Sequence, residues 1–208
     1  IYITGSPDLD LMSSSRLPKI EEVKKRYNIN FLNYAVGIFH PNPINLNKIK
    51  EEVEIFTKAL IRSKKKFVII YPNNDPGNEK IIKSYLKLNK NSNFRVFRSM
   101  RFEYFITLIK NSDFLIGNSS AGIREAPFLG LPTINLGNRQ HLRTNNPQIK
   151  NIDFNEIKIL NYIKKLKVKF KKSHEFGDGK SAEKIYKIIN EKNFWELNFQ
   201  KYFIRDYN

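Results

Sequence analysis

One stretch near the middle of the chain limits what this sequence can fold into. Residues 114–126 read FLIGNSSAGIREA. The apolar run at 114–116 predicts a short buried strand, the Gly-Asn-Ser-Ser segment predicts a tight turn, and residues 122–129 predict the start of a helix. The Asn and the two Ser of the turn are residue types that cap helix N-termini. A strand that leads through such a turn into a helix is typical of an α/β protein.

The same stretch predicts a phosphate site. A strand that turns into a helix directs several backbone N–H groups at one place, and the helix dipole adds partial positive charge there. Ser119 and Ser120 lie at that place, and Gly122 would let a bulky anion approach because it has no side chain. Glu125 follows about one helical turn later, and a carboxylate can accept hydrogen bonds from two neighbouring sugar hydroxyls. The combination favours a nucleotide, and an ordinary corner with a surface glutamate remains the alternative.

Composition narrows the function classes. The chain has 208 residues, of which 40% are hydrophobic, so an ordered core is expected. No apolar run is long enough to cross a bilayer, and we expect no membrane partner. The absence of Cys fits a reducing compartment, and we expect a cytoplasmic protein. The three histidines, His40, His141 and His174, are scattered, which argues against a metal site.

The charge balance is strongly basic, with 37 Lys and Arg against 20 Asp and Glu, a formal net charge of +17. Such a balance can indicate binding to nucleic acid or to an anionic membrane surface. Here the lysines are spread through the expected helices, and no recognised nucleic-acid-binding motif accompanies them. We therefore expect no nucleic-acid partner, although a positive field would help to recruit a phosphorylated substrate.

Expected strands and helices alternate along the chain. Strands are predicted at 2–4, 33–39, 66–71, 94–97, 114–116, 132–136 and 148–152. Helices are predicted at 9–12, 19–27, 44–63, 79–88, 101–110, 122–129, 155–166 and 181–192. This alternation predicts a Rossmann-like parallel sheet with helices on both faces. In such sheets, ligands bind at the carboxyl ends of the strands.

Several polar side chains fall at this predicted edge of the sheet. His40 follows a strand end, where an imidazole could bond a phosphate or move a proton at neutral pH, and a loop histidine without a role is the alternative. Arg139 could clamp a phosphate bidentately, or be a surface arginine. The helical spacing of Phe105 suggests core packing as its first interpretation and stacking on a base as its second. Asn73 and Asp75 are most simply turn formers.

Six motifs resemble, in the same order, those of the hydrolysing UDP-N-acetylglucosamine 2-epimerases. They are GSP at 5–7, FHP at 39–41, YPNNDPG at 71–77, GNSSAGIRE at 117–125, PTINLGNRQ at 132–140 and GDG at 177–179. The family has the GT-B architecture of two Rossmann-like halves, and this chain resembles the C-terminal half. The resemblance implies that residues 1–15 are a connection from a missing N-terminal domain and residues 16–190 a UDP-binding domain. The residues beyond it, 191–208, are predicted from their own pattern to form an amphipathic tail.

The resemblance also implies roles for individual residues. Glu125 would hold the ribose hydroxyls, and His40 matches the family's active-site histidine. The diphosphate would be held by Ser119, Ser120 and the backbone near Gly122, with Arg139 nearby. Phe105 and the backbone of Met100 would border the uracil, and Asn73 and Asp75 would belong to a substrate loop.

The reaction implied by the resemblance needs no metal and no nicotinamide cofactor. The family eliminates UDP across C1 and C2 of the sugar and then adds water, which releases a free manno-configured amino sugar. In bacteria this reaction feeds sialic or legionaminic acid synthesis. The carboxylates that move the C2 proton lie mostly in the N-terminal half, so we expect this chain to be inactive alone.

The expected partners are therefore a UDP-sugar, that N-terminal half and, as a further candidate, another copy of the chain. The non-hydrolysing branch usually reads Ser-Gly-Gly-x-Gln-Glu-Glu at the central turn and has a His in the Tyr-Pro loop. This sequence has neither, which favours the hydrolysing branch. A nucleotide-sugar-binding module without catalysis and a GT-B glycosyltransferase remain the alternatives.

Overall fold

The computed structural model describes residues 1–166, 170–196 and 200. Its chain contacts divide it into two compact units. Residues 14–175 form the larger unit, and residues 1–13 with the described residues from 176 onward form the smaller one. Most of the expected tail lies outside the described residues, and its amphipathic character stays a prediction.

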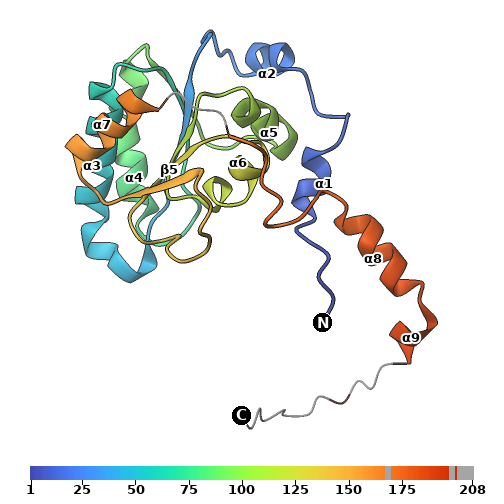
Figure 1. Cartoon of the computed structure of the whole chain (residues 1–208). Coiled ribbons are helices and arrows are strands. Elements are labelled where there is room, and N and C mark those ends of the chain that lie inside the picture. Colours follow the sequence, from blue (N-terminus) through green and yellow to red (C-terminus); the bar gives the residue numbers. More distant parts are fainter. Residues whose placement is uncertain (167–169, 197–199, 201–208) are drawn as a thin grey trace. The chain divides into compact units, whose positions relative to one another are not determined.

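The larger unit contains a parallel sheet of six strands within the described residues (Figure 1). The strand order is β3-β2-β1-β4-β5-β6. The bounds are β1 Ala35–Ile38, β2 Phe67–Ile70, β3 Phe94–Phe97, β4 Leu115–Gly117, β5 Thr133–Leu136 and β6 Ile149–Ile152. The strand order reverses between β1 and β4, which is where open α/β sheets bind ligands. The Rossmann-like sheet expected from the sequence is confirmed.

Helices cover both faces of this sheet, as expected (Figure 1). One face carries α3 (Ile49–Arg62), α4 (Asn78–Tyr85) and α7 (Glu156–Lys165), and the other carries α2 (Ile20–Arg26), α5 (Phe102–Lys110) and α6 (Glu125–Phe128). Two short 3-10 helices, η1 (Pro43–Lys48) and η2 (Leu88–Lys90), complete the layer with α3 and α4. None of the helices in the described residues is long and apolar enough to span a membrane.

Helix α3 starts later than expected. α3 buries Ile49, Val53, Phe56 and Leu60 on one face, as the helical spacing predicts. The predicted helix over 44–63 is wrong at its start, because η1 precedes α3 and buries no side chain. Because this segment packs no apolar face on the core, no core packing supports a regular α-helix there. It begins with a proline and contains one residue with non-helical dihedral angles.

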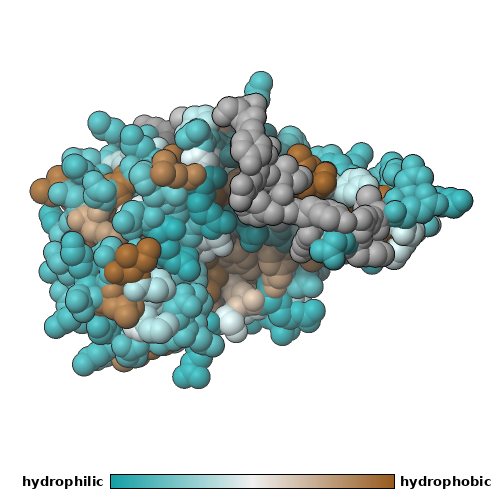
Figure 2. Space-filling model, turned by 90° about the horizontal axis from the view of Figure 1, so that it is seen from below, coloured by the Kyte–Doolittle hydropathy of each residue, from teal (hydrophilic) through white to brown (hydrophobic). Residues whose placement is uncertain are grey.

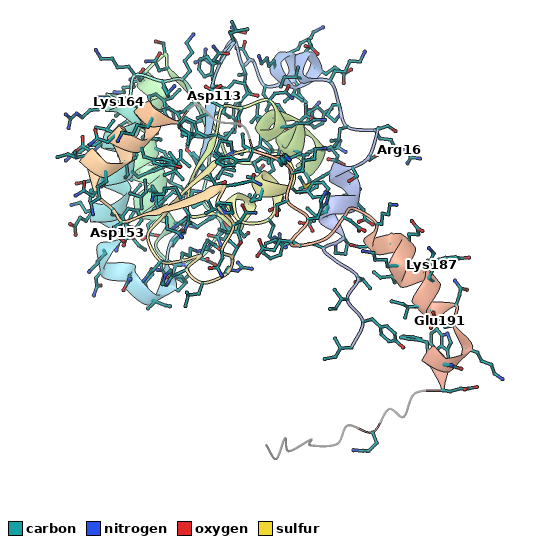
Figure 3. All side chains as sticks on the ribbon, viewed as in Figure 1. Arg16, Asp113, Asp153, Lys164, Lys187 and Glu191 are labelled. Atoms are coloured by element: carbon teal, nitrogen blue, oxygen red, sulfur yellow. The ribbon has the colours of Figure 1, made fainter. Side chains whose placement is uncertain are left out.

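The core lies between the sheet and its helices. All residues of β1, β4 and β5 are buried, as expected for parallel strands that are covered on both faces. Aromatic rings connect the layers, with Phe39 stacked on Phe56 at a centroid distance of 5.4 Å. Side chains fill the space between sheet and helices, whereas Lys164 points outward from α7 (Figure 3). Hydrophilic side chains cover most of the face seen in Figure 2, and hydrophobic ones form small separate groups.

The smaller unit contains α1 (Asp8–Met12), α8 (Ser181–Ile189) and α9 (Lys192–Trp195). The Asp10 carboxylate accepts hydrogen bonds from the N–H groups of Ser181 and Ala182 at 2.8 and 2.7 Å, which satisfies the start of α8. The expected strand at 2–4 is wrong, because residues 1–6 have no regular structure and Ile1 and Ile3 are exposed. An extended segment without a neighbouring strand has no ladder to join.

One glycine fixes the end of β4. Gly117 has a φ of +138°, and a Cβ built on it would lie 1.8 Å from the carbonyl oxygen of Ile38 on β1. We predict that Gly117→Ala lowers the free energy of unfolding by about 3 kcal/mol or more, because neither backbone segment can yield. Urea denaturation measures the loss.

Gly37→Ala is the matched control for this variant. The added Cβ at position 37 would crowd only the end of the Ile69 side chain, at 2.6 Å. Its expected loss is about 1–2 kcal/mol, because a side chain can shift where a carbonyl cannot. Equal losses in the two variants would contradict the backbone argument.

Candidate functional site

A cavity of about 380 Å³ lies at the carboxyl ends of the strands. Its lining comes from the segments that follow β1, β2, β3 and β4 and from the start of α5. It consists of Ile38, His40, Ile70, Tyr71, Pro72, Asn73, Arg98, Ser99, Met100, Phe102, Phe105, Ser119, Ser120, Ala121 and Glu125. The fold therefore brings together seven of the ten residues expected at the site. The other three, Gly122, Asp75 and Arg139, do not line it.

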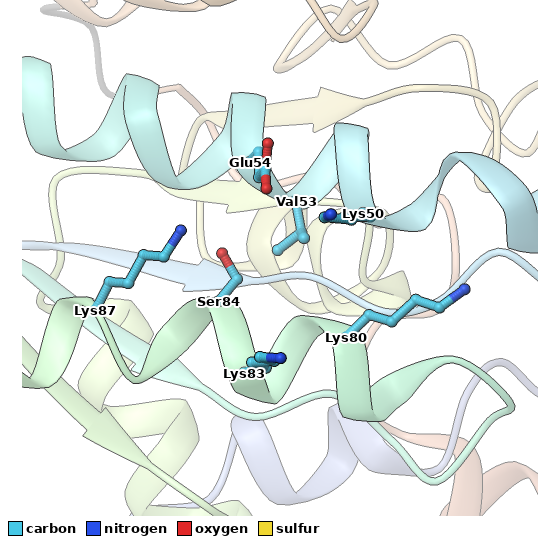
Figure 4. Close-up of a pocket in the computed structure, with 7 residues that line it drawn as sticks. All are labelled: Lys50, Val53, Glu54, Lys80, Lys83, Ser84 and Lys87. Atoms are coloured by element: carbon cyan, nitrogen blue, oxygen red, sulfur yellow. The ribbon is translucent and has the colours of Figure 1, made fainter.

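A larger groove of about 450 Å³ lies between α3 and α4 (Figure 4). It is lined by Lys50, Val53, Glu54, Lys80, Lys83, Ser84 and Lys87. The four lysines are exposed, and the groove belongs to the outer helical layer, away from the loops that converge at the strand ends. Ligands of open α/β sheets bind at the strand ends, so the smaller cavity is the candidate site.

The turn after β4 forms one wall of that cavity. Ser119 caps the 3-10 helix η3 (Ser120–Gly122), with its Oγ accepting a hydrogen bond from the Ala121 N–H at 3.3 Å. The backbone N–H groups of Ser119 and Ser120 donate to no acceptor within the described residues. Both residues line the cavity, so these N–H groups are the candidates for the phosphate contact that the sequence predicts.

The helix expected at 122–129 is wrong in its extent. The 3-10 helix η3 ends at Gly122, Ile123 and Arg124 form a turn, and α6 begins only at Glu125. Because η3 is a single turn, little helix dipole adds to its N–H groups. Individual backbone donors therefore matter more at this corner than a macrodipole.

Position 122 requires glycine for a different geometric reason from the one expected. A Cβ at this position would lie 2.7 Å from Cγ2 of Thr133 and 3.3 Å from Cδ2 of Leu115. The missing side chain thus lets η3 pack closely on β4 and β5, and it does not face the cavity. The Gly122 N–H donates to the Ser119 carbonyl at 3.1 Å. A contact between this backbone and a diphosphate stays a prediction.

Glu125 is buried, with 6% of its surface exposed, and it lines the cavity. The alternative of a surface glutamate is therefore wrong. The carboxylate stands at the first position of α6, and its Oε1 lies 3.3 Å from Nη2 of Arg124. A buried, oriented carboxylate at the mouth of a strand-end cavity is suited to accept hydrogen bonds from hydroxyl groups.

His40 is held by hydrogen bonds on its backbone and on its ring. Its Nδ1 accepts a hydrogen bond from the Asn73 N–H at 3.0 Å. With that lone pair occupied, the neutral ring carries its proton on Nε2. The cavity thus has an Nε2–H donor beside the Ser119 turn.

Burial lowers the pKa of His40 to about 4, and the positive charge of Arg139 acts in the same direction, while Asp75 opposes them. Protonation of Nδ1 would also displace the hydrogen bond from Asn73. In the absence of a bound anion, His40 is therefore neutral at pH 7. The sequence expectation that it moves a proton at neutral pH does not fit the site in that state.

Arg139 and Asp75 form a brace beside His40. Nη1 of Arg139 donates to the Asn118 carbonyl at 3.2 Å, and Nη2 lies 3.7 Å from Oδ2 of Asp75. The same carboxylate oxygen accepts a hydrogen bond from the Asn73 amide at 2.6 Å. This brace ties the loop after β2 to the loop after β5. A contact between Arg139 and phosphate stays a prediction.

Phe105 is only partly buried and lines the cavity, whereas Ile106, Leu108 and Ile109 form the buried side of α5. Phe105 therefore does not belong to the fully buried side of the helix, and its stacking on a base stays a prediction. Met100 lines the same cavity, and a contact between its backbone and a base stays a prediction.

Sequence reasoning missed Asn118 and Arg98. Arg98 is an exposed cation that lines the cavity directly after β3. Its basic side chain at a predicted strand end could have identified it as a site residue. The sequence predicts a capping role for Asn118, but the side chain that caps the following turn is that of Ser119. Its two hydrogen bonds to a residue 78 positions away give no local pattern.

The perturbed His40 makes stability depend on pH. The unfolded chain protonates this histidine near pH 6.5 and the folded chain only near pH 4, so the unfolded state holds more protons between these values. We predict that the free energy of unfolding falls as pH drops from 6.5 to 4, by at most about 3 kcal/mol from this group. His40→Gln should remove this part of the slope.

Urea denaturation at pH 7, 5.5 and 4 measures the slope. His141→Gln, at an exposed histidine of the loop after β5, is the matched control and should keep the wild-type slope. An unchanged slope in His40→Gln would show that His40 is not buried neutral in solution.

Comparison with known proteins places this chain in a family. The sequence profile of UDP-N-acetylglucosamine 2-epimerase matches residues 1–190. A UDP-N-acetylglucosamine 2-epimerase of Neisseria meningitidis serogroup B is 40% identical over 98% of this chain and 55% of its own. A UDP-N,N'-diacetylbacillosamine 2-epimerase (hydrolyzing) of Legionella pneumophila is 27% identical over 91% of this chain and 51% of its own.

Among solved structures, a UDP-GlcNAc 2-epimerase of Methanocaldococcus jannaschii, in complex with UDP-GlcNAc and UDP, is similar with a TM-score of 0.67. The identity is 20%, and the match covers 91% of this chain and 54% of that one. This likeness confirms the expected fold, a Rossmann-like half of a GT-B protein. The chain spans about half the length of the curated relatives it matches. With a profile match over 190 of its 208 residues, the chain belongs to the UDP-N-acetylglucosamine 2-epimerase family.

Proposed function

We propose that this chain is the nucleotide-binding half of a hydrolysing UDP-N-acetylglucosamine 2-epimerase, or of a relative that acts on a UDP-diacetamido sugar. The observation that supports the proposal most directly is the strand-end cavity. It combines unused N–H groups at Ser119 and Ser120, the buried carboxylate of Glu125 and the Nε2–H of His40. The Methanocaldococcus relative, whose solved complex contains UDP-GlcNAc and UDP, supports a UDP-sugar as the ligand.

In the proposed complex, each wall of the cavity takes one part of UDP. The Ser119–Ser120 turn and the backbone near Gly122 bind the diphosphate, with Arg139 nearby, and Glu125 accepts hydrogen bonds from both ribose hydroxyls. Phe105 and the backbone of Met100 border the uracil. The sugar then lies towards His40 and the loop of Asn73 and Asp75, which already touch each other.

The proposed reaction has two steps. In the first, the C2 proton is removed, a C1–C2 double bond forms, and the bond from C1 to the UDP oxygen breaks. In the second, water adds its hydroxyl to C1, and a proton is delivered to the opposite face of C2. His40 acts on the first step, because its Nε2–H can donate to the oxygen that becomes negative as UDP leaves.

The hydrolysing outcome is supported by the motifs and by the Legionella relative, which is named as hydrolyzing at 27% identity. The Neisseria relative, at 40% identity, carries no such specification in its name. We propose that the free sugar enters sialic or legionaminic acid synthesis in a bacterium. A cytoplasmic location, an N-terminal half of the same enzyme and self-association stay predictions.

A binding module without catalysis is the second candidate. Among the described residues that line the cavity, Glu125 is the single carboxylate, and the proposal already gives it the ribose. No other acid in this lining can remove the C2 proton. The chain by itself would therefore bind UDP-sugars and not convert them, which agrees with the expected inactivity of the isolated half.

Binding by the isolated chain tests the cavity. We predict that calorimetry detects UDP at a millimolar or better dissociation constant, and that Glu125→Gln weakens binding by roughly 10- to 100-fold, because a charged hydrogen bond to a hydroxyl contributes about 1.5–3 kcal/mol. Glu54→Gln, in the groove between α3 and α4, is the matched control and should bind as wild type. Equal affinity in wild type and Glu125→Gln would rule out the proposed ribose contact.

Turnover tests the role of His40. In the enzyme with its N-terminal half, we expect His40→Ala to lower kcat by about 100-fold or more, the scale for removing one preorganised donor, with a smaller change in KM. Release of free sugar and UDP from UDP-N-acetylglucosamine is the measurement. A drop confined to KM would make His40 a phosphate ligand, and normal turnover would exclude it from the reaction.

A further inference from the structure

Asn118 makes an unusual pair of hydrogen bonds. Its Oδ1 accepts from the backbone N–H of His40 at 2.7 Å, and its Nδ2 donates to the backbone carbonyl of the same residue at 2.9 Å. The side chain is 2% exposed. One buried carboxamide therefore satisfies both backbone groups of the residue that carries the imidazole.

The position of Asn118 explains why a carboxamide is needed. The regular pairing of β1 with β4 ends at Ile38 and Gly117, and the Asn118 N–H still donates to the Ile38 carbonyl at 3.1 Å. Beyond this point the chain turns away into η3. A carboxamide has the same donor and acceptor as a peptide group. The Asn118 side chain thus continues the parallel ladder to His40 after the backbone of β4 has left it.

The other side of Asn118 is also fixed. Its backbone carbonyl accepts hydrogen bonds from Nη1 of Arg139 at 3.2 Å and from Nε2 of Gln140 at 3.0 Å. Gln140 is itself 4% exposed. Asn118 therefore joins the loops that follow β1, β4 and β5, and these contacts use its main chain, so they do not depend on its side chain.

We propose that Asn118 is a positioning residue, whose carboxamide fixes the His40 backbone and so holds the imidazole at the wall of the cavity. Without the carboxamide, the N–H and carbonyl of His40 would lose their partners in a partly buried place, and the loop would rearrange to hydrate them. The function of that placement rests on the proposed role of His40. The clamp itself does not rest on it.

Asn135 provides a matched comparison for the clamp. It is a buried asparagine on the next strand, 1% exposed, with its Nδ2 donating to Oδ1 of Asn151 at 2.7 Å. It does not line the cavity, and its side-chain hydrogen bond joins β5 to β6 and not to the His40 loop. Asn118→Ala and Asn135→Ala both remove a buried carboxamide from the same sheet, but only the first removes the clamp.

The readout is the titration of the His40 ring, followed by NMR in the full chain without ligand. The groups that face it, Arg139, Asp75 and the Asn73 N–H, are intact in both variants. In Asn118→Ala we expect the pKa of His40 to rise by about one unit or more towards its usual 6.5, because the ring becomes hydrated. In Asn135→Ala we expect the wild-type value despite a similar loss of stability. A folded Asn118→Ala with wild-type titration would overturn the proposal.

Hydrogen exchange in the wild type supplies a second measurement that needs no variant. The clamp requires the His40 N–H to be protected to within about tenfold of the Val36 N–H in β1, although His40 lies beyond the strand. Exchange at the rate of an open loop amide would overturn the proposal even if Asn118→Ala did not fold.

UDP titration of the same variants separates the clamp from the proposed function. A shifted His40 pKa with full UDP affinity would keep the clamp and remove His40 from UDP binding. An unshifted pKa with intact UDP binding in a folded Asn118→Ala would reject the clamp and leave the proposed function standing.

Discussion

The close approach of β1 and β4 at their carboxyl ends determines most of what this structure can do. The Ile38 carbonyl occupies the space that a Cβ on residue 117 would need, so the two backbones touch where the strand order reverses. Parallel strands are joined by long crossovers, and each crossover begins with a loop at this edge. Four such loops therefore reach one cavity, and the contact between β1 and β4 sets the spacing between His40 and the Ser119 turn.

The electrostatics of the cavity follow from this crowding. At pH 7 His40 is neutral, and the charges of Arg139 and Asp75 face each other beside it. A diphosphate would meet oriented N–H donors at close range, while attraction at long range comes from the net charge of +17. Bound negative charge favours the imidazolium, and linkage then requires that protonation of His40 strengthens anion binding by the same factor. In the proposed function, binding of an anion next to His40 would therefore be accompanied by proton uptake.

The sequence predicted the sheet and most of its helices because their signals are local. The buried runs of β1, β4 and β5 and the helical spacing of Ile49, Val53 and Phe56 can be recognised without knowing the neighbours. Seven of the predicted site residues line the cavity for a related reason, since strand ends in a parallel sheet share one edge. The close packing of Gly122 on Thr133 and the clamp of Asn118 on His40 are contacts between different segments of the chain, so no local sequence pattern reveals them.

The distribution of groups in this cavity also argues for a division of labour in the proposed enzyme. Inverting C2 requires removal of a proton from one face and its return to the other, so two acid–base groups must stand on opposite sides of the sugar. The described cavity lining has one carboxylate, Glu125, in contact with Arg124, and one histidine whose Nδ1 is already occupied. These groups suit the binding of UDP and the stabilisation of its departure. We propose that the proton-moving groups, and with them the choice of sugar, come from the expected N-terminal half.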